Sequence, residues 1–242
     1  MNLEQNPRGN LVKHGALLLA LALGLAVLPA AAPAWAQDIL TADQFFSQVA
    51  DRYAQVADYE GRINIAAGKD VMSGVIAYKA PSLLRIDFVQ PPDQVIAFDG
   101  QRLVVYIPSL RAVLQQQAAG KPGAGSAGLA TREGLKMMKR NYTVAYEASP
   151  AAEPLDAATP EPVVRLALNR KSVAEGFRTM RLSVSPETKL IRRIEGTTVS
   201  GERFVFDFVG IKLNQGIPEA RFIYDSPASA NVYNNFLFGS DN

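Results

Sequence analysis

The chain has few side chains that could carry out covalent catalysis. It contains one histidine, His14, and no cysteine. His14 lies in an N-terminal segment that we expect to be removed on export, which would leave neither imidazole nor thiol in the mature chain. This composition excludes a Ser-His-Asp triad, a cysteine nucleophile, histidine acid–base chemistry and the usual zinc and copper sites. We therefore expect no catalytic residues, no metal and no cofactor.

An enzyme would have to rely on carboxylates, Lys, Tyr or Ser alone, and a carboxylate-based hydrolase is one alternative. The candidate acids are scattered over predicted strand ends and turns, and the sequence does not signal a pair at the separation that glycosidases use. A polar cleft with paired carboxylates would favour a hydrolase, whereas a dry apolar cleft would favour a binding protein. The candidates are Asp87, Asp93, Asp99, Glu195 and Glu202.

Apolar and polar residues alternate along most of the chain. The clearest examples are residues 84–88, where Leu, Ile and Phe alternate with Arg85 and Asp87, and residues 204–208. This period of two is typical of strands with one buried face. The turn signal Asp99-Gly100 separates two of the strands. We predict a mainly β (α+β) protein in which one antiparallel sheet curls to hide its apolar face.

Two helices are predicted beside the sheet. The first starts at Thr41, which begins a capping-box pattern, and continues with apolar residues at helical spacing. The second spans residues 131–140, after a loop at 118–128 that is rich in Gly and Ala. Leu135 and Met138 share one face of this second helix, so we expect that face to be buried. Its other face carries Lys136, Lys139 and Arg140.

The N-terminus is typical of a secretory signal peptide. Arg8 and Lys13 precede an apolar run at residues 16–28, and Ala34-Trp35-Ala36 is a small-x-small cleavage site. The apolar run is shorter than the roughly 20 residues needed to span a bilayer. We therefore predict cleavage of residues 1–36 and export to the periplasm. The remaining 242 − 36 = 206 residues, 37–242, are expected to form a single domain.

The charge of the chain is close to neutral. The formal charge is +2, and removal of Glu4, Arg8 and Lys13 with the signal leaves +2 + 1 − 2 = +1. The sequence contains no block of basic residues interleaved with aromatic residues. We therefore expect no nucleic-acid partner.

A series of short motifs in residues 79–108 resembles a known family. The motifs are Lys79 and Pro81 before a Leu-rich strand, Gln90-Pro91, Asp99-Gly100, and Tyr106 with Pro108. Their order and spacing are similar to those of the LolA family, the outer-membrane lipoprotein carrier proteins of the bacterial periplasm. The order of the predicted elements also resembles the family: an N-terminal helix, a strand meander, a mid-chain helix and further strands.

The resemblance implies a fold and a function. LolA-like proteins form an incomplete barrel from a strongly curved antiparallel sheet, and helices cover its concave face as a lid over an apolar cavity. The cavity would bind the acyl chains of lipoproteins, and the protein, a monomer without enzymatic activity, would shuttle them from the inner to the outer membrane. Its partners would be an inner-membrane ABC-type lipoprotein-releasing complex and an outer-membrane acceptor. The residues expected to line the cavity are Leu84, Ile86, Phe88, Ile96, Phe98, Leu135 and Met138.

One position departs from the family pattern. Many LolA-like proteins have an arginine directly before the proline, and this arginine holds the lid closed. In this chain the position is occupied by Ala80. Lys79 and Arg85 flank it and are our candidates for lid or gating residues. For the seven apolar residues, an ordinary filled core is the alternative to a cavity.

The C-terminal part of the chain leaves two further questions open. Residues 220–227 are predicted to end one more strand, and residues 232–238 to form either a final strand or an element that gates a neighbouring pocket. Two alternative functions keep the same fold. One is a LolA-like sensor that binds a regulator of an envelope sigma factor, and the other is a carrier of glycolipids or other amphiphiles.

The predicted cleavage site can be tested directly. We expect the mature protein to begin at Gln37, because signal peptidase cleaves after small-x-small sites. N-terminal sequencing of the exported protein measures this. An exported form that still carries residues 1–36 would contradict the prediction.

Overall fold

The structure is a computed structural model that describes residues 40–117, 129–172 and 176–235. The predicted signal peptide at 1–36 and the predicted loop at 118–128 lie outside the described residues. Of the apolar C-terminal segment 232–238, residues 232–235 are described.

Both predicted helices are present and begin with side-chain caps. Helix α1 spans Ala42–Ala54, and α2 spans Arg132–Asn141. Before α1, Thr41 and Gln44 exchange side-chain hydrogen bonds with each other's backbone N–H groups, which confirms the capping box. The hydroxyl of Thr131 accepts a hydrogen bond of 3.1 Å from the backbone N–H of Gly134 in α2. These caps pair N–H groups that the first turn of a helix leaves without intrahelical partners.

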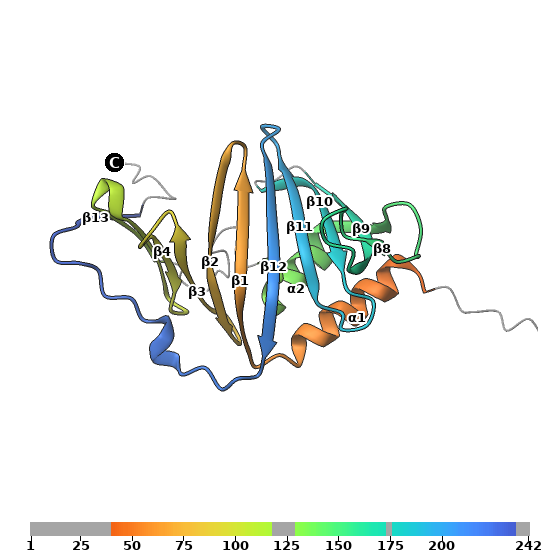
Figure 1. Cartoon of the computed structure of the whole chain (residues 1–242), viewed down its shortest axis with the longest axis horizontal. Helices are drawn as coiled ribbons and strands as arrows, with labels where there is room; N and C mark the ends of the chain where they lie inside the picture. The colour runs from red at the N-terminus through yellow and green to blue at the C-terminus, as the bar shows by residue number, and fades with distance from the viewer. Residues whose placement is uncertain (1–39, 118–128, 173–175, 236–242) are drawn as a thin grey trace, which may run out of the picture. The chain divides into compact units, whose positions relative to one another are not determined.

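The strands form one open, curved sheet in the described part of the chain (Figure 1). Its order is β13-β6-β5-β4-β3-β2-β1-β12-β11-β10-β9-β7, with the short β8 paired to β9. All neighbours are antiparallel except β13 and β6, which are parallel. The predicted mainly β fold with a curved antiparallel sheet is therefore confirmed. The strands are β1 Asp58–Ala67, β2 Asp70–Lys79, β3 Leu83–Gln90, β4 Val95–Phe98, β5 Arg102–Ile107, β6 Ala112–Gln117, β7 Tyr142–Tyr146, β8 Glu153–Pro154, β9 Pro162–Arg170, β10 Phe177–Val184, β11 Ile191–Thr198, β12 Arg203–Leu213 and β13 Asn231–Asn234.

The helices lie on the concave face, over the half of the sheet that contains β9 to β12 (Figure 1). Phe46 and Val49 of α1 are fully buried in the core. The hydroxyl of Tyr53 accepts a hydrogen bond of 3.2 Å from the backbone N–H of Ile191 in β11, and burial raises the pKa of Tyr53 to about 12. Among the described residues, neither helix is long and apolar enough to cross a membrane.

A segment that we call the strap, residues 214–224, follows β12 and crosses the outer face of the sheet. The prediction of a strand at 220–227 was wrong, because these residues begin with a 3-10 turn, Glu219–Phe222, whose Phe222 is buried against Ala77 and Leu83. The reason is the place of β12, which already has β1 and β11 as neighbours. The chain finds no open sheet edge there and must cross to the far edge, where β13 pairs with β6.

One buried carboxylate fixes the start of the strap. Asp58, which is 3% exposed, accepts hydrogen bonds from three successive backbone N–H groups, those of Gln215, Gly216 and Ile217, at 2.7 to 3.2 Å. Hydrogen bonds from backbone N–H groups to an ionised carboxylate are stronger than those between neutral groups. The strap is therefore anchored at the beginning of β1.

Lys79 and Arg85 fasten the next part of the strap. The Nζ of Lys79 donates to the carbonyl oxygen of Ile217 (2.6 Å), and Arg85 donates to the carbonyl oxygens of Arg221 (3.2 Å) and Ile223 (3.0 Å). These partners lie on the outer face of β2 and β3, opposite to the helices. We predicted Lys79 and Arg85 as lid or gating residues. In the described part of the chain, their polar contacts are with the strap and with Asp87, and a gating role for them stays a prediction.

Asp87 completes this fastening. It pairs with Arg85 (2.8 Å) and with Arg221 of the strap (2.7 Å). Burial opposes ionisation of Asp87, but the hydrogen bonds and positive charges of the two guanidinium groups outweigh it and lower its pKa. The ring of Tyr224 lies 5.5 Å from the Arg85 guanidinium, in cation–π contact.

The lowered pKa of Asp87 predicts that the strap loosens in acid. A carboxyl with a lowered folded pKa stabilises the folded state above its ordinary pKa of about 4, and this contribution is lost as the pH falls through the folded value. We expect Asp87→Asn to reduce stability at pH 7 by about 1 kcal/mol or less, because solvent screens these partly exposed ion pairs. The difference from wild type should shrink as the pH falls below about 4 and through the lowered pKa of Asp87.

Thermal unfolding between pH 7 and pH 3 measures this difference. The matched control is Asp93→Asn, which changes an exposed carboxyl in the turn after β3. If both variants showed the same pH dependence, Asp87 would not be the group that holds the strap.

Candidate functional site

The concave face of β2 to β6 carries two adjacent rows of side chains that run across the strands. Directly opposed residues on one face of an antiparallel pair have Cβ atoms about 5 Å apart. The rows therefore form a continuous, mostly apolar surface. The first row is Ile76, Ile86, Ile96, Val105 and Leu114, and the second is Tyr78, Leu84, Phe98, Leu103 and Gln116.

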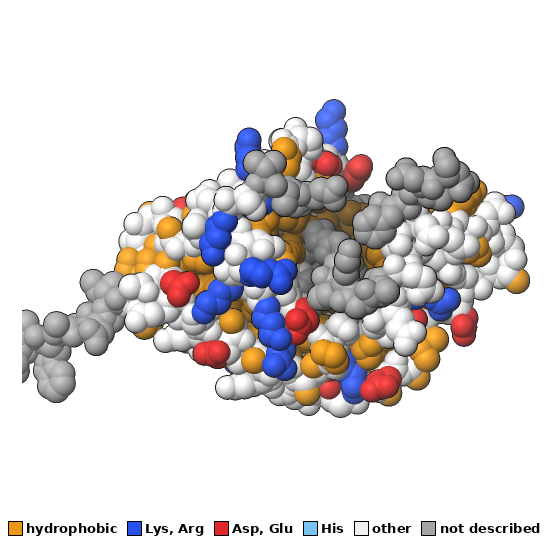
Figure 2. Space-filling model, turned by 180° about the vertical axis from the view of Figure 1, so that it is seen from behind, with side chains coloured by type: hydrophobic (Ala, Val, Ile, Leu, Met, Phe, Trp, Pro, Cys, Tyr) orange, Lys and Arg blue, Asp and Glu red, His pale blue; other side chains and the backbone are white. Residues whose placement is uncertain are grey.

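Exposure increases along the first row toward the edge of the sheet. Ile76 and Ile86 are fully buried, whereas Ile96, Val105 and Leu114 are partly exposed. The helices lie over the other half of the sheet (Figure 1). Figure 2, which views the molecule from the side of the helices, shows hydrophobic side chains at the surface among the charged ones. The apolar surface thus continues beyond the part that the two helices cover.

The structure brings the seven predicted cavity residues together in one hydrophobic core. Six of them are buried, with exposed fractions of 5% or less, and Ile96 is partly buried and packs against them. Burial of this kind occurs both in a filled core and around a closed cavity. That these residues bind acyl chains therefore stays a prediction. The buried six are Leu84, Ile86, Phe88, Phe98, Leu135 and Met138.

Two tyrosines that the sequence analysis missed join the start of α2 to the sheet. Tyr59 in β1 and Tyr78 in β2 are opposite each other in register, with ring centroids 5.1 Å apart. The buried hydroxyl of Tyr59 donates to the carbonyl oxygen of Ala130 (3.1 Å). The hydroxyl of Tyr78 donates to the carbonyl oxygen of Pro81 (3.1 Å) and also accepts a hydrogen bond from the backbone of Arg132, the first residue of α2. Burial raises the pKa of both tyrosines, so both stay protonated donors.

Ala80 stands where many LolA-like proteins have an arginine. Its side chain packs against the hydrophobic core, and its backbone N–H donates to the carbonyl oxygen of Ala57 (2.8 Å). A methyl group cannot donate a hydrogen bond to α2. The described polar contacts between this part of the sheet and the start of α2 come from Tyr59 and Tyr78 instead.

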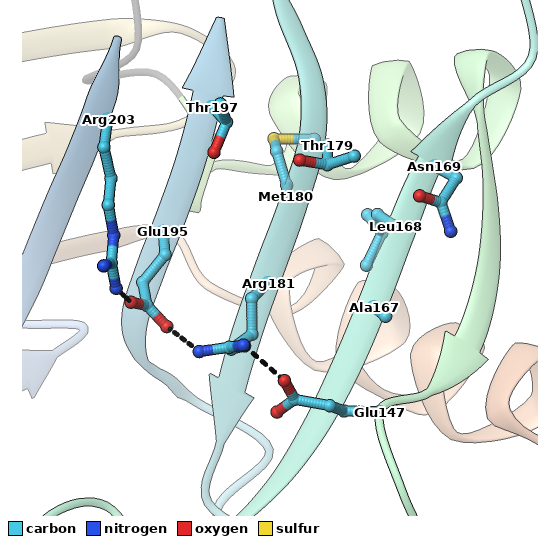
Figure 3. A pocket seen from close by; sticks show the side chains of 10 residues that line it. All are labelled: Glu147, Ala167, Leu168, Asn169, Thr179, Met180, Arg181, Glu195, Thr197 and Arg203. Carbon is cyan, nitrogen blue, oxygen red and sulfur yellow. Dashed lines mark hydrogen bonds and ion pairs between the residues drawn. The ribbon is translucent and has the colours of Figure 1, made fainter. Parts of the chain in front are cut away.

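A polar pocket of about 430 Å³ lies on the outer face of the sheet, away from the apolar rows (Figure 3). A chain of ion pairs runs along it from Glu147 through Arg181 and Glu195 to Arg203, with 2.9 Å between Arg181 and Glu195. Ala167, Asn169, Thr179 and Thr197 form much of the remaining lining.

The chemistry of this pocket does not match that of a carboxylate-based hydrolase. Burial raises the pKa of Glu195, but the hydrogen bonds from Arg203 and Arg181 outweigh it, so the net shift is downward. A general acid needs a raised pKa, and both carboxylates here are paired with arginine. Within the described ranges, no three His, Cys, Asp or Glu side chains come together in a way that could hold a metal ion.

Two proteins described as outer-membrane lipoprotein carrier proteins are similar to this chain. The protein from Dechloromonas aromatica is 28% identical over 160 residues, which cover 66% of this chain and 70% of that protein. The protein from Albidiferax ferrireducens is 25% identical over 181 residues, which cover 74% of this chain and 81% of that protein.

The fold and the family agree with these similarities. An uncharacterized conserved protein from Thermus thermophilus has a similar fold, with a TM-score of 0.52, 12% identity, and coverage of 78% of this chain and 98% of that one. The family described as "Outer membrane lipoprotein carrier protein LolA" matches residues 64–225. Since this match spans more than half of the chain, the protein belongs to the LolA family.

Proposed function

We propose that the protein binds the acyl chains of lipoproteins on the concave face of its sheet and carries them through the periplasm from the inner to the outer membrane. The observation that carries this proposal is the first apolar row. Its residues Ile96, Val105 and Leu114 continue the core toward the sheet edge while they remain partly exposed. An acyl chain laid along this row would bury them.

The energy of acyl burial explains why such a surface is needed. Each buried CH₂ group contributes about 0.8 kcal/mol, so several long chains total tens of kcal/mol. A carrier must offer apolar surface of comparable strength and then release the chains without breaking a covalent bond. A concave face of aliphatic and aromatic side chains meets this need, and such a carrier requires no catalytic group.

The partners follow from this route. A membrane-bound complex of the ABC type would load the carrier at the inner membrane, and an acceptor at the outer membrane would unload it, as the LolA family match supports. The predicted signal peptide supports a periplasmic location. We propose that the carrier acts as a monomer, without nucleic acid and without enzymatic activity.

Ile96→Asp separates acyl binding from folding. An ionised carboxylate beside acyl chains loses its water when cargo binds, which should weaken uptake of an acylated lipoprotein by at least about tenfold. The partly exposed carboxylate can stay hydrated in the empty protein, so the melting temperature should fall by only a few degrees. Ile86→Asp, at a fully buried position, separates a cavity from a filled core: weaker uptake with little loss of stability would indicate a cavity, and a large loss of stability would indicate a filled core.

Two quantities are measured for each variant. The first is the melting temperature of the empty protein, and the second is the uptake of a lipoprotein from detergent micelles, with acylated and with unacylated cargo. Val89→Asp is the matched control, because Val89 lies in the same region of the sheet and is 70% exposed. It should change neither quantity. Equal uptake of acylated and unacylated cargo, or undiminished uptake by Ile96→Asp, would overturn the proposal.

A further inference from the structure

The outward face of α2 carries positive charge that takes no part in the proposed binding of acyl chains. All four exposed residues of this helix are basic: Arg132, Lys136, Lys139 and Arg140. Lys171, directly after β9, is also exposed, and its Nζ lies 3.3 Å from the carbonyl oxygens of Lys139 and Arg140. We call these five residues the basic patch. Figure 2 shows Lys and Arg side chains gathered on this side of the molecule.

Most cations of the basic patch differ from many arginines of the sheet and the strap in their ion pairing. Many arginines of the sheet and the strap are paired with carboxylates. Within the described residues, only Lys136 of the patch has such a partner, Glu133, at 2.9 Å and with 58% of the lysine side chain exposed. The arginines with carboxylate partners are Arg85, Arg102, Arg165, Arg181, Arg192, Arg193, Arg203 and Arg221.

The local charge remains positive when neighbouring groups are included. The five cations and Glu133 give 5 − 1 = +4. The neighbouring helix α1 carries Asp43, Asp51 and Arg52, which changes the sum to 4 − 2 + 1 = +3. The chain outside its predicted signal peptide has a formal charge of only +1, so the positive charge is concentrated here.

We propose that the basic patch docks the protein on anionic phospholipid headgroups. The purpose of this contact rests on the proposed function, because a carrier of acyl chains must meet membranes, but the contact itself needs no cargo. Basic clusters bind anionic bilayers electrostatically, and each cation near the surface raises the partition coefficient about fivefold. The contact is effective within a Debye length, about 8 Å at physiological salt.

The composition of the patch favours headgroups over an acidic protein. Protein interfaces have an apolar core in which charged residues, and lysine in particular, are depleted. Every exposed residue of α2 is Lys or Arg, and Met137 between them is only partly exposed. A bilayer surface needs no complementary apolar centre. Diffuse negative charge is sufficient for binding.

Docking in this way would also place the apolar side of α2 close to the membrane. Leu135 and Met138 point to the interior and are 1% and 0% exposed, on the side of the helix opposite to the basic patch. A helix with its side chains is about 10 Å across. Acyl chains that leave the concave face beside α2 would therefore have only a short distance to cross.

The test is sedimentation of the full mature protein with vesicles. Wild type should bind vesicles of equal parts phosphatidylglycerol and phosphatidylcholine, not vesicles of phosphatidylcholine alone, and 0.5 M salt should release it because salt screens exposed charges. The triple variant Arg132→Gln, Lys136→Gln and Arg140→Gln should bind about 100-fold more weakly, at about fivefold for each cation. Glutamine is a good helix former, so α2 should persist.

A control triple variant removes the same number of positive charges at positions outside the basic patch. Arg62→Gln, Lys69→Gln and Lys212→Gln change exposed cations of β1, the β1–β2 turn and β12, and should retain vesicle binding. Equal loss in both variants, or wild-type binding that ignores phosphatidylglycerol, would overturn the proposal. A third outcome would also overturn it: wild type does not bind vesicles, but the patch variant fails to transfer lipoprotein. That result would indicate that the basic patch binds an acidic protein. Uptake of lipoprotein from micelles is measured separately from vesicle binding. A failure of the proposed acyl binding can therefore be distinguished from a failure of membrane docking.

Discussion

The breadth of the apolar face is the constraint on which the rest of the structure depends. A sheet with one apolar face must cover it with other elements. Of the 13 strands in the described residues, twelve follow one another in the sheet, which corresponds to about 50 Å at the usual strand spacing. The two helices have 13 and 10 residues, hence lengths of about 20 and 15 Å. They cover part of the face, and curvature alone does not bury Ile96, Val105 and Leu114.

The path of the chain at its end follows from the same sheet. Because β12 pairs with β1 and β11, the chain after it cannot add a strand beside it. The strap instead crosses the outer face, where Asp58, Lys79 and Arg85 hold it by hydrogen bonds to backbone groups. These hydrogen bonds give the outer face a polar attachment. The same face also buries apolar side chains, both in the cluster of Ala77, Ile217 and Phe222 and at Val95, Ala97 and Val104 in β4 and β5.

Local signals in the sequence predicted more than long-range ones did. The period of two at residues 84–88 and the capping box at Thr41 depend on near neighbours, and both are confirmed. The same alternation places the side chain of Arg85 on the other face of β3 from those of Leu84 and Ile86, where it contacts the strap. The strap and the contacts of Tyr59 and Tyr78 depend on the pairing of β1 with β12 and on the position of α2. No local pattern encodes those, although a tyrosine in an apolar stripe signals a buried hydrogen-bond partner.

The attachment of α2 has consequences for opening of the concave face. An arginine that donates to the backbone of this helix would add charge-assisted hydrogen bonds of about 1.5–3 kcal/mol each. With Ala80 in that place, the described polar contacts to the start of α2 come from the neutral hydroxyls of Tyr59 and Tyr78, and such hydrogen bonds contribute about 1 kcal/mol each. Burial of Leu135 and Met138 then supplies much of the remaining attachment. Acyl chains in the proposed site could contact those same two side chains. Bound cargo would then replace the apolar contacts that Leu135 and Met138 lose when the helix moves, so the net cost in free energy would be small.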